Sequence, residues 1–103
     1  MHAVPPGGHV IIVGLGFTGR TVARALRAAG IPYVILEENG PLVRQARMER
    51  EPVIFGDGTR QDVLEHVGIR QARAVVFCIA SANEERRGVV VARNLSASVH
   101  IVV

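Results

Sequence analysis

The sequence contains no lysine and no tryptophan, and aromatic residues make up only 4% of its 103 residues. So few aromatic side chains argue against a surface on which nucleic-acid bases stack. All 12 basic residues are arginine, and they are interleaved along the chain with nine carboxylates. The net charge of +3 therefore does not describe a continuous basic face. We expect no nucleic-acid partner.

Cysteine is nearly absent as well. The single residue, Cys78, excludes an internal disulfide and suits a reducing compartment. Because it lies inside an apolar run, we interpret it as a small core residue rather than a reactive thiol. No apolar run approaches the roughly 18 residues that cross a bilayer, and the first residues lack the pattern of a signal peptide. These features favour a soluble domain in a reducing compartment.

Apolar residues account for 49% of the chain, and they gather in short runs rich in valine and isoleucine. Such runs predict strands at 9–13, 33–37, 52–56, 74–80 and 99–103. Because the runs are continuous rather than alternating, the strands should be covered on both faces, as in a parallel sheet. Helices are expected from the glycine-rich loop to Gly30 and over 41–49, 60–67 and 83–95.

These elements predict an α/β fold, a Rossmann-like doubly wound sheet of five parallel strands in the order 3-2-1-4-5. Residues 1–8 are interpreted as a linker, and residues 9–103 as one nucleotide-binding domain. We expect this domain to be part of a larger protein, because the last predicted strand runs to the final residue.

Apolar stripes that face the sheet are expected in two of the helices. They comprise Val22, Ala25, Leu26 and Ala29 in the first helix, and Gly88, Val91, Ala92 and Leu95 in the fourth. Val89 and Val90 widen the second stripe toward a partner surface.

A glycine-rich loop joins the first predicted strand to the first helix. Gly14, Gly16 and Gly19 form the pattern G-L-G-F-T-G, typical of dinucleotide-binding turns. In such a turn the first glycine makes the bend, the second admits a pyrophosphate, and the third packs the helix against the strand. The alternative is that the three glycines only allow a tight turn.

An acidic residue at the end of the second predicted strand favours the nucleotide interpretation. Glu37 lies where a carboxylate accepts hydrogen bonds from ribose hydroxyls. The same charge would repel a 2′-phosphate, so we expect NAD(H) or an adenosine nucleotide and not NADP(H). Glu38 either lines the adenosine site or faces solvent.

Two further loops end near the same edge of the sheet. Asp57 and Gly58 either border the adenine or only form a turn, and Thr59 with Asp62 predicts a capping box for the third helix. Ser81 with Glu84 predicts a cap for the fourth helix, and Ala80 and Ser81 end the fourth strand beside the crevice. The candidate nucleotide-binding residues are Gly14, Leu15, Gly16, Phe17, Thr18, Gly19, Glu37, Glu38, Asp57, Gly58, Ala80 and Ser81.

Neither a metal site nor a catalytic set is indicated. The four histidines, at positions 2, 9, 66 and 100, are dispersed without the spacing of metal ligands. No serine or aspartate is placed beside one of them to form a nucleophilic set. We expect each histidine at a strand end, a helix end or the surface.

The stretches HVIIVGLGFTGRTVARALRAAGIPYVILEEN and EPVIFGDGTRQDVLEHVGIRQARAVVFCIAS resemble the regulator-of-potassium-conductance domain, of the TrkA-N type. The resemblance implies a cytoplasmic domain at the inner face of the membrane, dimeric or in a ring. It implies binding of NAD(H), AMP, ADP or ATP and gating of a potassium channel or cation–proton antiporter. This chain has Phe17 where many members of the family have arginine, and Gly58 where alanine is common.

Two other functions are compatible with the residues. One is the cofactor-binding half of an NAD-dependent oxidoreductase, which would need a separate catalytic domain. The other is a structural domain that assembles without any ligand.

Overall fold

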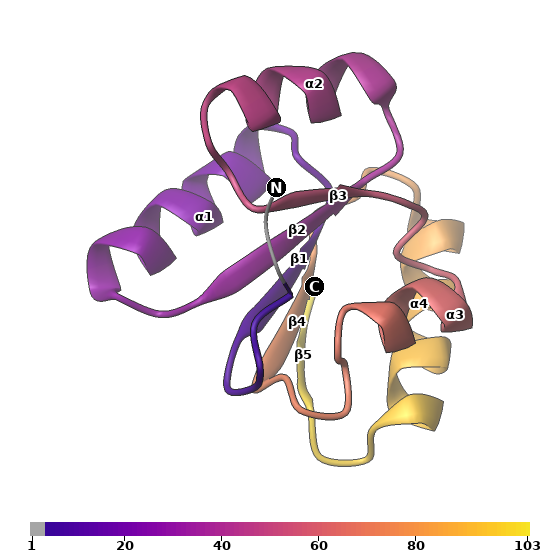
Figure 1. Ribbon diagram of the computed structural model, residues 1–103. Helices are drawn as coiled ribbons and strands as arrows, with labels where there is room; N and C mark the ends of the chain where they lie inside the picture. Colours follow the sequence, from indigo (N-terminus) through magenta and orange to yellow (C-terminus); the bar gives the residue numbers. More distant parts are fainter. Residues whose placement is uncertain (1–3) are drawn as a thin grey trace.

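A computed structural model describes residues 4–103 of the chain. It confirms a five-stranded parallel sheet in the order β3-β2-β1-β4-β5 (Figure 1). The strands are β1 (Val10–Val13), β2 (Tyr33–Glu37), β3 (Val53–Phe55), β4 (Ala74–Phe77) and β5 (His100–Val102). The helices are α1 (Phe17–Ala29), α2 (Gly40–Met48), α3 (Gln61–His66) and α4 (Ala82–Leu95). Within residues 4–103 no helix has both the length and the apolarity needed to cross a bilayer.

The helices cover both faces of the sheet. In Figure 1, α1 and α2 lie on one side of the strands, and α3 and α4 lie on the other. Successive side chains of a strand point to opposite faces, so each continuous apolar run supplies both cores. In β1, Val10 and Ile12 pack in the core beneath α1 and α2, whereas Ile11 and Val13 pack in the other core. This explains why the strand sequences do not alternate in polarity.

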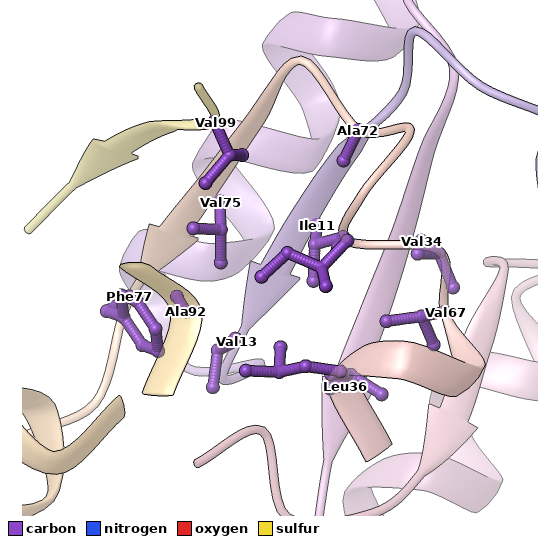
Figure 2. Close-up of a cluster of buried hydrophobic side chains, with 12 residues drawn as sticks. Ile11, Val13, Val34, Leu36, Val67, Ala72, Val75, Phe77, Ala92 and Val99 are labelled. Carbon is purple, nitrogen blue, oxygen red and sulfur yellow. The ribbon is translucent and has the colours of Figure 1, made fainter. Parts of the chain in front are cut away.

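The core beneath α3 and α4 is shown in Figure 2. Ile11 and Val13 of β1 lie there beside Val75 and Phe77 of β4, and Ala92 of α4 faces them. Ile11, Ile12, Ile35 and Leu64 are each fully buried. Burial of each such side chain contributes about 1.5–3 kcal/mol.

The strands are shorter than the sequence predicts, most clearly β4, which ends at Phe77 rather than at residue 80. Beyond it, Ile79 and Ala80 leave the sheet and line a surface cavity. Their apolar character therefore serves the cavity rather than a strand. The other boundaries differ from the predictions by at most one residue, and β2 matches its predicted bounds.

The predicted inward stripe of α1 is partly wrong. Ala25 and Ala29 are exposed, whereas Gly19 and Ala23 are buried against the sheet. Val22 and Leu26 are partly buried, as the stripe requires. The helix approaches the sheet so closely at Gly19 that small residues occupy the centre of its inner face. Gly30, with φ of 72°, then ends the helix in the left-handed conformation.

The segment before β1 contacts the domain where the structure describes it. The Gly8 N–H donates to the Gln71 carbonyl at 2.9 Å, and Arg73 Nε donates to the Gly8 carbonyl at 2.7 Å. His9 is fully buried, with Nε2 2.8 Å from the Val67 carbonyl oxygen. His2 and the start of the predicted linker lie outside the described residues.

The packing of α4 against β4 can be tested at Gly88. A Cβ added there would lie 2.5 Å from the ring of the buried Phe77. Alanine in a helix is normally about 1 kcal/mol better than glycine. We expect Gly88→Ala instead to lower the free energy of unfolding by about 1–3 kcal/mol, because the ring must move. Urea denaturation measures this change.

Gly40→Ala is the matched control, because an added Cβ there meets only the flexible end of Arg44 at 3.4 Å. It should be neutral or stabilising. A Gly88→Ala protein as stable as the Gly40→Ala protein would contradict the packing described here.

Candidate functional site

A cavity of about 430 Å³ lies at the carboxyl edge of the sheet. The strand order reverses at this edge, because β1 has β2 on one side and β4 on the other. Such a switch point is where doubly wound sheets bind ligands. The cavity is lined by Val13, Gly14, Leu15, Gly16, Leu36, Glu37, Glu38, Leu42, Gly56, Asp57, Gly58, Thr59, Cys78, Ile79, Ala80, Ser81 and Glu84.

Two of the three loop glycines are required by the fold itself. Gly14 has φ of 106°, and a Cβ added there would overlap the Cys78 carbonyl oxygen. A Cβ added at Gly19 would overlap the Gly14 carbonyl oxygen. Gly14 therefore makes the bend, and Gly19 allows α1 to begin directly beside β1. Gly19 does not line the cavity.

Gly16 has no such structural reason. A Cβ added there would meet nothing within 4 Å, and its φ of −81° is open to any residue. Gly16 is the N-cap of α1, yet no side chain caps the helix and its first turn has no acidic residue. In the described part of the chain, the amides of Phe17, Thr18 and Gly19 have no acceptor. This helix end therefore presents free N–H groups and positive potential beside the cavity.

The Glu37 carboxylate holds the loop in place. Its Oε1 accepts from the Leu15 N–H at 2.8 Å, and its Oε2 accepts from the Glu38 and Asn39 N–H groups at 3.0 and 2.9 Å. The Gly14 N–H also donates to the Leu36 carbonyl at 2.8 Å. The end of β2 is thereby tied to the loop after β1, and the carboxylate borders the cavity.

The predicted capping box at Thr59 is wrong. The Asp57 Oδ1 accepts from both the Thr59 N–H, at 2.9 Å, and the Thr59 hydroxyl, at 2.7 Å. Thr59 is thus held in a turn by the nearer carboxylate, and the N-cap of α3 is Arg60, without a side-chain hydrogen bond. Asp57 and Gly58 form a turn and also line the cavity, so the two interpretations of this loop are not exclusive.

The predicted cap of α4 is confirmed. Ser81 is the N-cap, and its hydroxyl accepts from the Glu84 N–H at 3.2 Å. This places the first turn of α4 at the cavity, where Ala80, Ser81 and Glu84 line it. Ser81 is therefore both a cap and a wall residue.

A second cavity, of about 330 Å³, adjoins the first on the side of β4. It shares Gly16, Cys78, Ile79 and Ala80 with the first cavity and adds Phe17, Thr18 and Phe77. Phe17 is 88% exposed. Of the candidate residues, Phe17 and Thr18 thus lie at this second cavity rather than at the first.

Carboxylates dominate the charge of the main cavity. The pKa of Glu38 is raised above its usual value, chiefly by the negative charge of Asp57 and then by partial desolvation. Glu84 and Glu37 raise it further, and the positive charge of Arg87 opposes the shift. Cys78 is half-buried, and burial raises the pKa of its thiol. That shift disfavours the reactive thiolate.

Sequence reasoning missed several lining residues. Leu42, Cys78, Ile79 and Glu84 were not among the candidates, and each follows the end of a strand that borders the switch point. The capping pattern that identified Ser81 also contained Glu84, so the sequence could have indicated that Glu84 lies at the same edge.

Residues 4–103 contain no cluster of three or more histidine, cysteine, aspartate or glutamate side chains able to hold a metal ion.

Together these features define a class of domain: a doubly wound α/β unit with a glycine-rich loop, an uncapped first helix and an acid at the tip of β2. The sequence pattern of the TrkA-N domain matches residues 10–103. The chain belongs to the TrkA-N domain family.

Two relatives illustrate this membership. Potassium channel protein 1 of Methanocaldococcus jannaschii is 30% identical over 97 residues, which are 91% of this chain and 29% of that protein. The glutathione-regulated potassium-efflux system protein KefC of Escherichia coli is 33% identical over 70 residues, 68% of this chain and 11% of that protein. This chain thus spans a minor part of both relatives.

A solved structure is also similar. The Kef CTD of Shewanella denitrificans in its AMP-bound form is 29% identical, with a TM-score of 0.79. The match covers 90% of this chain and 55% of that one.

The different roles of the loop glycines predict different stabilities. We expect Gly19→Ala to lower the free energy of unfolding by about 2 kcal/mol or more, because the new methyl group meets backbone rather than a movable side chain. Gly16→Ala should lower it by less than about 1 kcal/mol, the usual loss for alanine at an N-cap. Chemical denaturation of both variants gives the two values. If both variants lose the same free energy of unfolding, Gly16 and Gly19 do not have the different roles described above.

The shift at Glu38 predicts a pH dependence. Its pKa in the folded state exceeds the usual 4.5, so the ionised side chain opposes folding, and this cost grows as pH rises through the folded-state pKa. We expect Glu38→Gln to melt at or above the wild-type temperature at about pH 7, with the difference vanishing at about pH 4. Thermal unfolding followed by circular dichroism tests this.

A variant of opposite sign serves as the control. The Arg60 guanidinium, which donates to Asp62, holds the pKa of that carboxyl below its usual 3.8. Asp62→Asn should therefore lower the melting temperature at about pH 7 and lose its effect as pH falls through the folded-state pKa. A Glu38→Gln protein that melts below the wild type at neutral pH would show that the repulsion is not significant.

Proposed function

We propose that this domain senses an adenosine nucleotide, NAD(H) or AMP, ADP or ATP, in the cavity beside the glycine-rich loop. Gly16 carries the proposal: it is the loop glycine that neither the backbone conformation nor the surrounding atoms require. A glycine without a structural reason is explained by close approach of a ligand to the main chain. The free amides of the first turn of α1 supply the donors for a phosphate.

The size and lining of the cavity support this ligand class. Sites for small molecules commonly have volumes of about 300–1,000 Å³ and combine apolar walls with a few polar groups. Here Leu36, Leu42 and Ile79 offer apolar surface near the strand ends, and Glu37 offers a hydrogen-bond acceptor. A nucleotide would place its phosphate at α1 and its sugar toward β2. The AMP-bound Kef relative, which is 29% identical, makes AMP the first ligand to test.

The sugar would bind Glu37 in competition with the main chain. An ionised carboxylate has about four lone-pair sites, and Glu37 already accepts three N–H groups. We propose that one ribose hydroxyl donates to the remaining site, and that a second binds only if one N–H is released. A 2′-phosphate would bring like charge against this carboxylate, which disfavours NADP(H).

The wider role that we propose is regulation of ion transport. The relatives are a potassium channel protein and a potassium-efflux protein, and this chain covers only part of each. We propose that the domain lies at the cytoplasmic face of such a protein as a homodimer or ring, and acts by binding rather than by hydride transfer. Shifting a two-state switch from 1:99 to 99:1 requires about 5.5 kcal/mol of differential binding. Several charge-assisted hydrogen bonds of about 1.5–3 kcal/mol must then differ between the two states.

Gly16→Ser tests the proposal because stability and binding should move in different directions. Serine is a favoured N-cap residue, so we expect the free energy of unfolding to stay equal or rise by a few tenths of a kcal/mol. Its hydroxyl would occupy the amides that the phosphate needs, so the affinity for AMP should fall at least about ten-fold, the value of one charge-assisted hydrogen bond. Calorimetric titration and thermal unfolding measure the two effects.

Thr21→Ser is a suitable control, because Thr21 lies one turn further along α1, is exposed and lines neither cavity. It should leave the affinity unchanged. If wild-type protein binds none of NAD⁺, NADH, AMP, ADP and ATP, the proposed function is wrong. If Gly16→Ser binds AMP as the wild type does, the phosphate does not lie at the start of α1.

A further inference from the structure

The main cavity has an unusual charge for a site that binds an anion. Four carboxylates line it, those of Glu37, Glu38, Asp57 and Glu84. None of its lining residues is an arginine or a histidine, although the chain has 12 arginines. Two arginines outside the lining act on acidic residues: Arg87 acts on Glu38, and Arg60 pairs with Asp62.

Two of the four carboxylates are held by local hydrogen bonds. Glu37 accepts three backbone N–H groups, and Asp57 accepts the N–H and the hydroxyl of Thr59. In the described residues, the carboxylates of Glu38 and Glu84 accept no hydrogen bond and form no ion pair. Their charges are therefore available to act on a ligand.

Glu38 and Glu84 reach the cavity from different elements. Glu38 follows β2, and Glu84 stands in the first turn of α4. The two carboxylates nevertheless lie close enough to repel each other, because the charge of Glu84 is one of the causes that raise the pKa of Glu38. A ligand in the cavity thus experiences repulsion from two sides.

The positive potential at the N-terminus of α1 acts only over a short distance. The free amides of this helix hold one phosphate group, and the helix potential falls off within the first turn. The second cavity, which adjoins this helix end and is lined by residues such as Phe17, Phe77 and Ile79, also has no charged residue in its lining. The residues that line the two cavities thus provide no cation for a second or third phosphate.

We infer that the cavity ranks adenosine ligands by their negative charge, and that Glu38 and Glu84 are the specificity-determining residues. This inference rests on the proposed function. NAD⁺, whose nicotinamide cation offsets part of its phosphate charge, carries the least negative charge. AMP, ADP and ATP carry successively more, so affinity decreases in that order. The site favours a dinucleotide or monophosphate and rejects a polyphosphate.

The experiment titrates the 103-residue chain with NAD⁺, AMP, ADP and ATP by calorimetry, with EDTA present so that no divalent cation neutralises the phosphates. Each added negative charge should weaken binding about five-fold, because like charges in a partly aqueous site repel each other. The ratio of the ATP and AMP dissociation constants should approach one as salt rises from about 0.05 to 0.5 M, because salt screens the repulsion.

The double variant Glu38→Gln with Glu84→Gln identifies the residues responsible. Its affinity for ATP should rise about ten-fold or more, whereas its affinity for NAD⁺ should change less than about three-fold. Glu85→Gln is the matched control, because Glu85 also lies in the first turn of α4 but does not line the cavity. It should leave the ranking unchanged. Thermal unfolding checks that all variants fold.

The outcomes separate this inference from the proposed function. If AMP and NAD⁺ bind but ATP binds as tightly as AMP, the charge ranking is wrong and the site itself stands. If the ranking is observed but persists in the double variant, Glu38 and Glu84 do not determine it. If no nucleotide binds, the proposed function fails, and this inference fails with it.

Discussion

At the start of α1 the main chain passes itself at a distance that only glycine permits. Gly19 lies against the Gly14 carbonyl group, and Gly14 lies against the Cys78 carbonyl group at the end of β4. This contact allows α1 to begin directly beside β1, and it sets the free end of the helix at the switch point of the sheet. The Glu37 carboxylate then fastens the loop to β2 through the Leu15 N–H. The free amides of α1 and the Glu37 carboxylate are thereby brought to the same cavity.

The same cavity combines opposing electrostatic effects. The uncapped N-terminus of α1 attracts an anion, whereas four carboxylates repel it. Binding free energy at such a site is a small difference between larger opposing contributions. A ligand that differs by one phosphate changes that difference substantially. Under the proposed function, this balance suits the site to distinguishing related nucleotides rather than to holding any of them as a permanent cofactor.

Helix α4 connects the cavity to the outside of the domain. Its first turn, capped by Ser81, stands at the cavity, and Gly88 and Ala92 pack its middle tightly against the sheet. Further along, Val90 is 59% exposed, on the side where the valine run of this helix predicts a partner surface. The same helix therefore contributes both to the cavity wall and to this exposed apolar surface.

Much of this protein is determined locally, and those parts were predictable from the sequence. The strands and helices follow from hydrophobic runs and glycine positions, because burial and backbone sterics act on each segment separately. The order of the sheet follows from the general rule that parallel strands are joined by right-handed crossovers. The Ser81 cap, local to its own turn, was also predicted correctly.

Other features depended on neighbours that are distant in sequence. Thr59 had two carboxylates within reach, and only the folded loop decided for Asp57 rather than Asp62. The inner face of α1 shifted to Gly19 and Ala23 because its distance from β1 is set by the loop. The sequence by itself determined which residues form the sheet and where the loop lies. Only the tertiary structure decided that Gly16 faces open space and that Glu84 joins Glu38 at one cavity, because both are relations between segments that meet only when the sheet has formed.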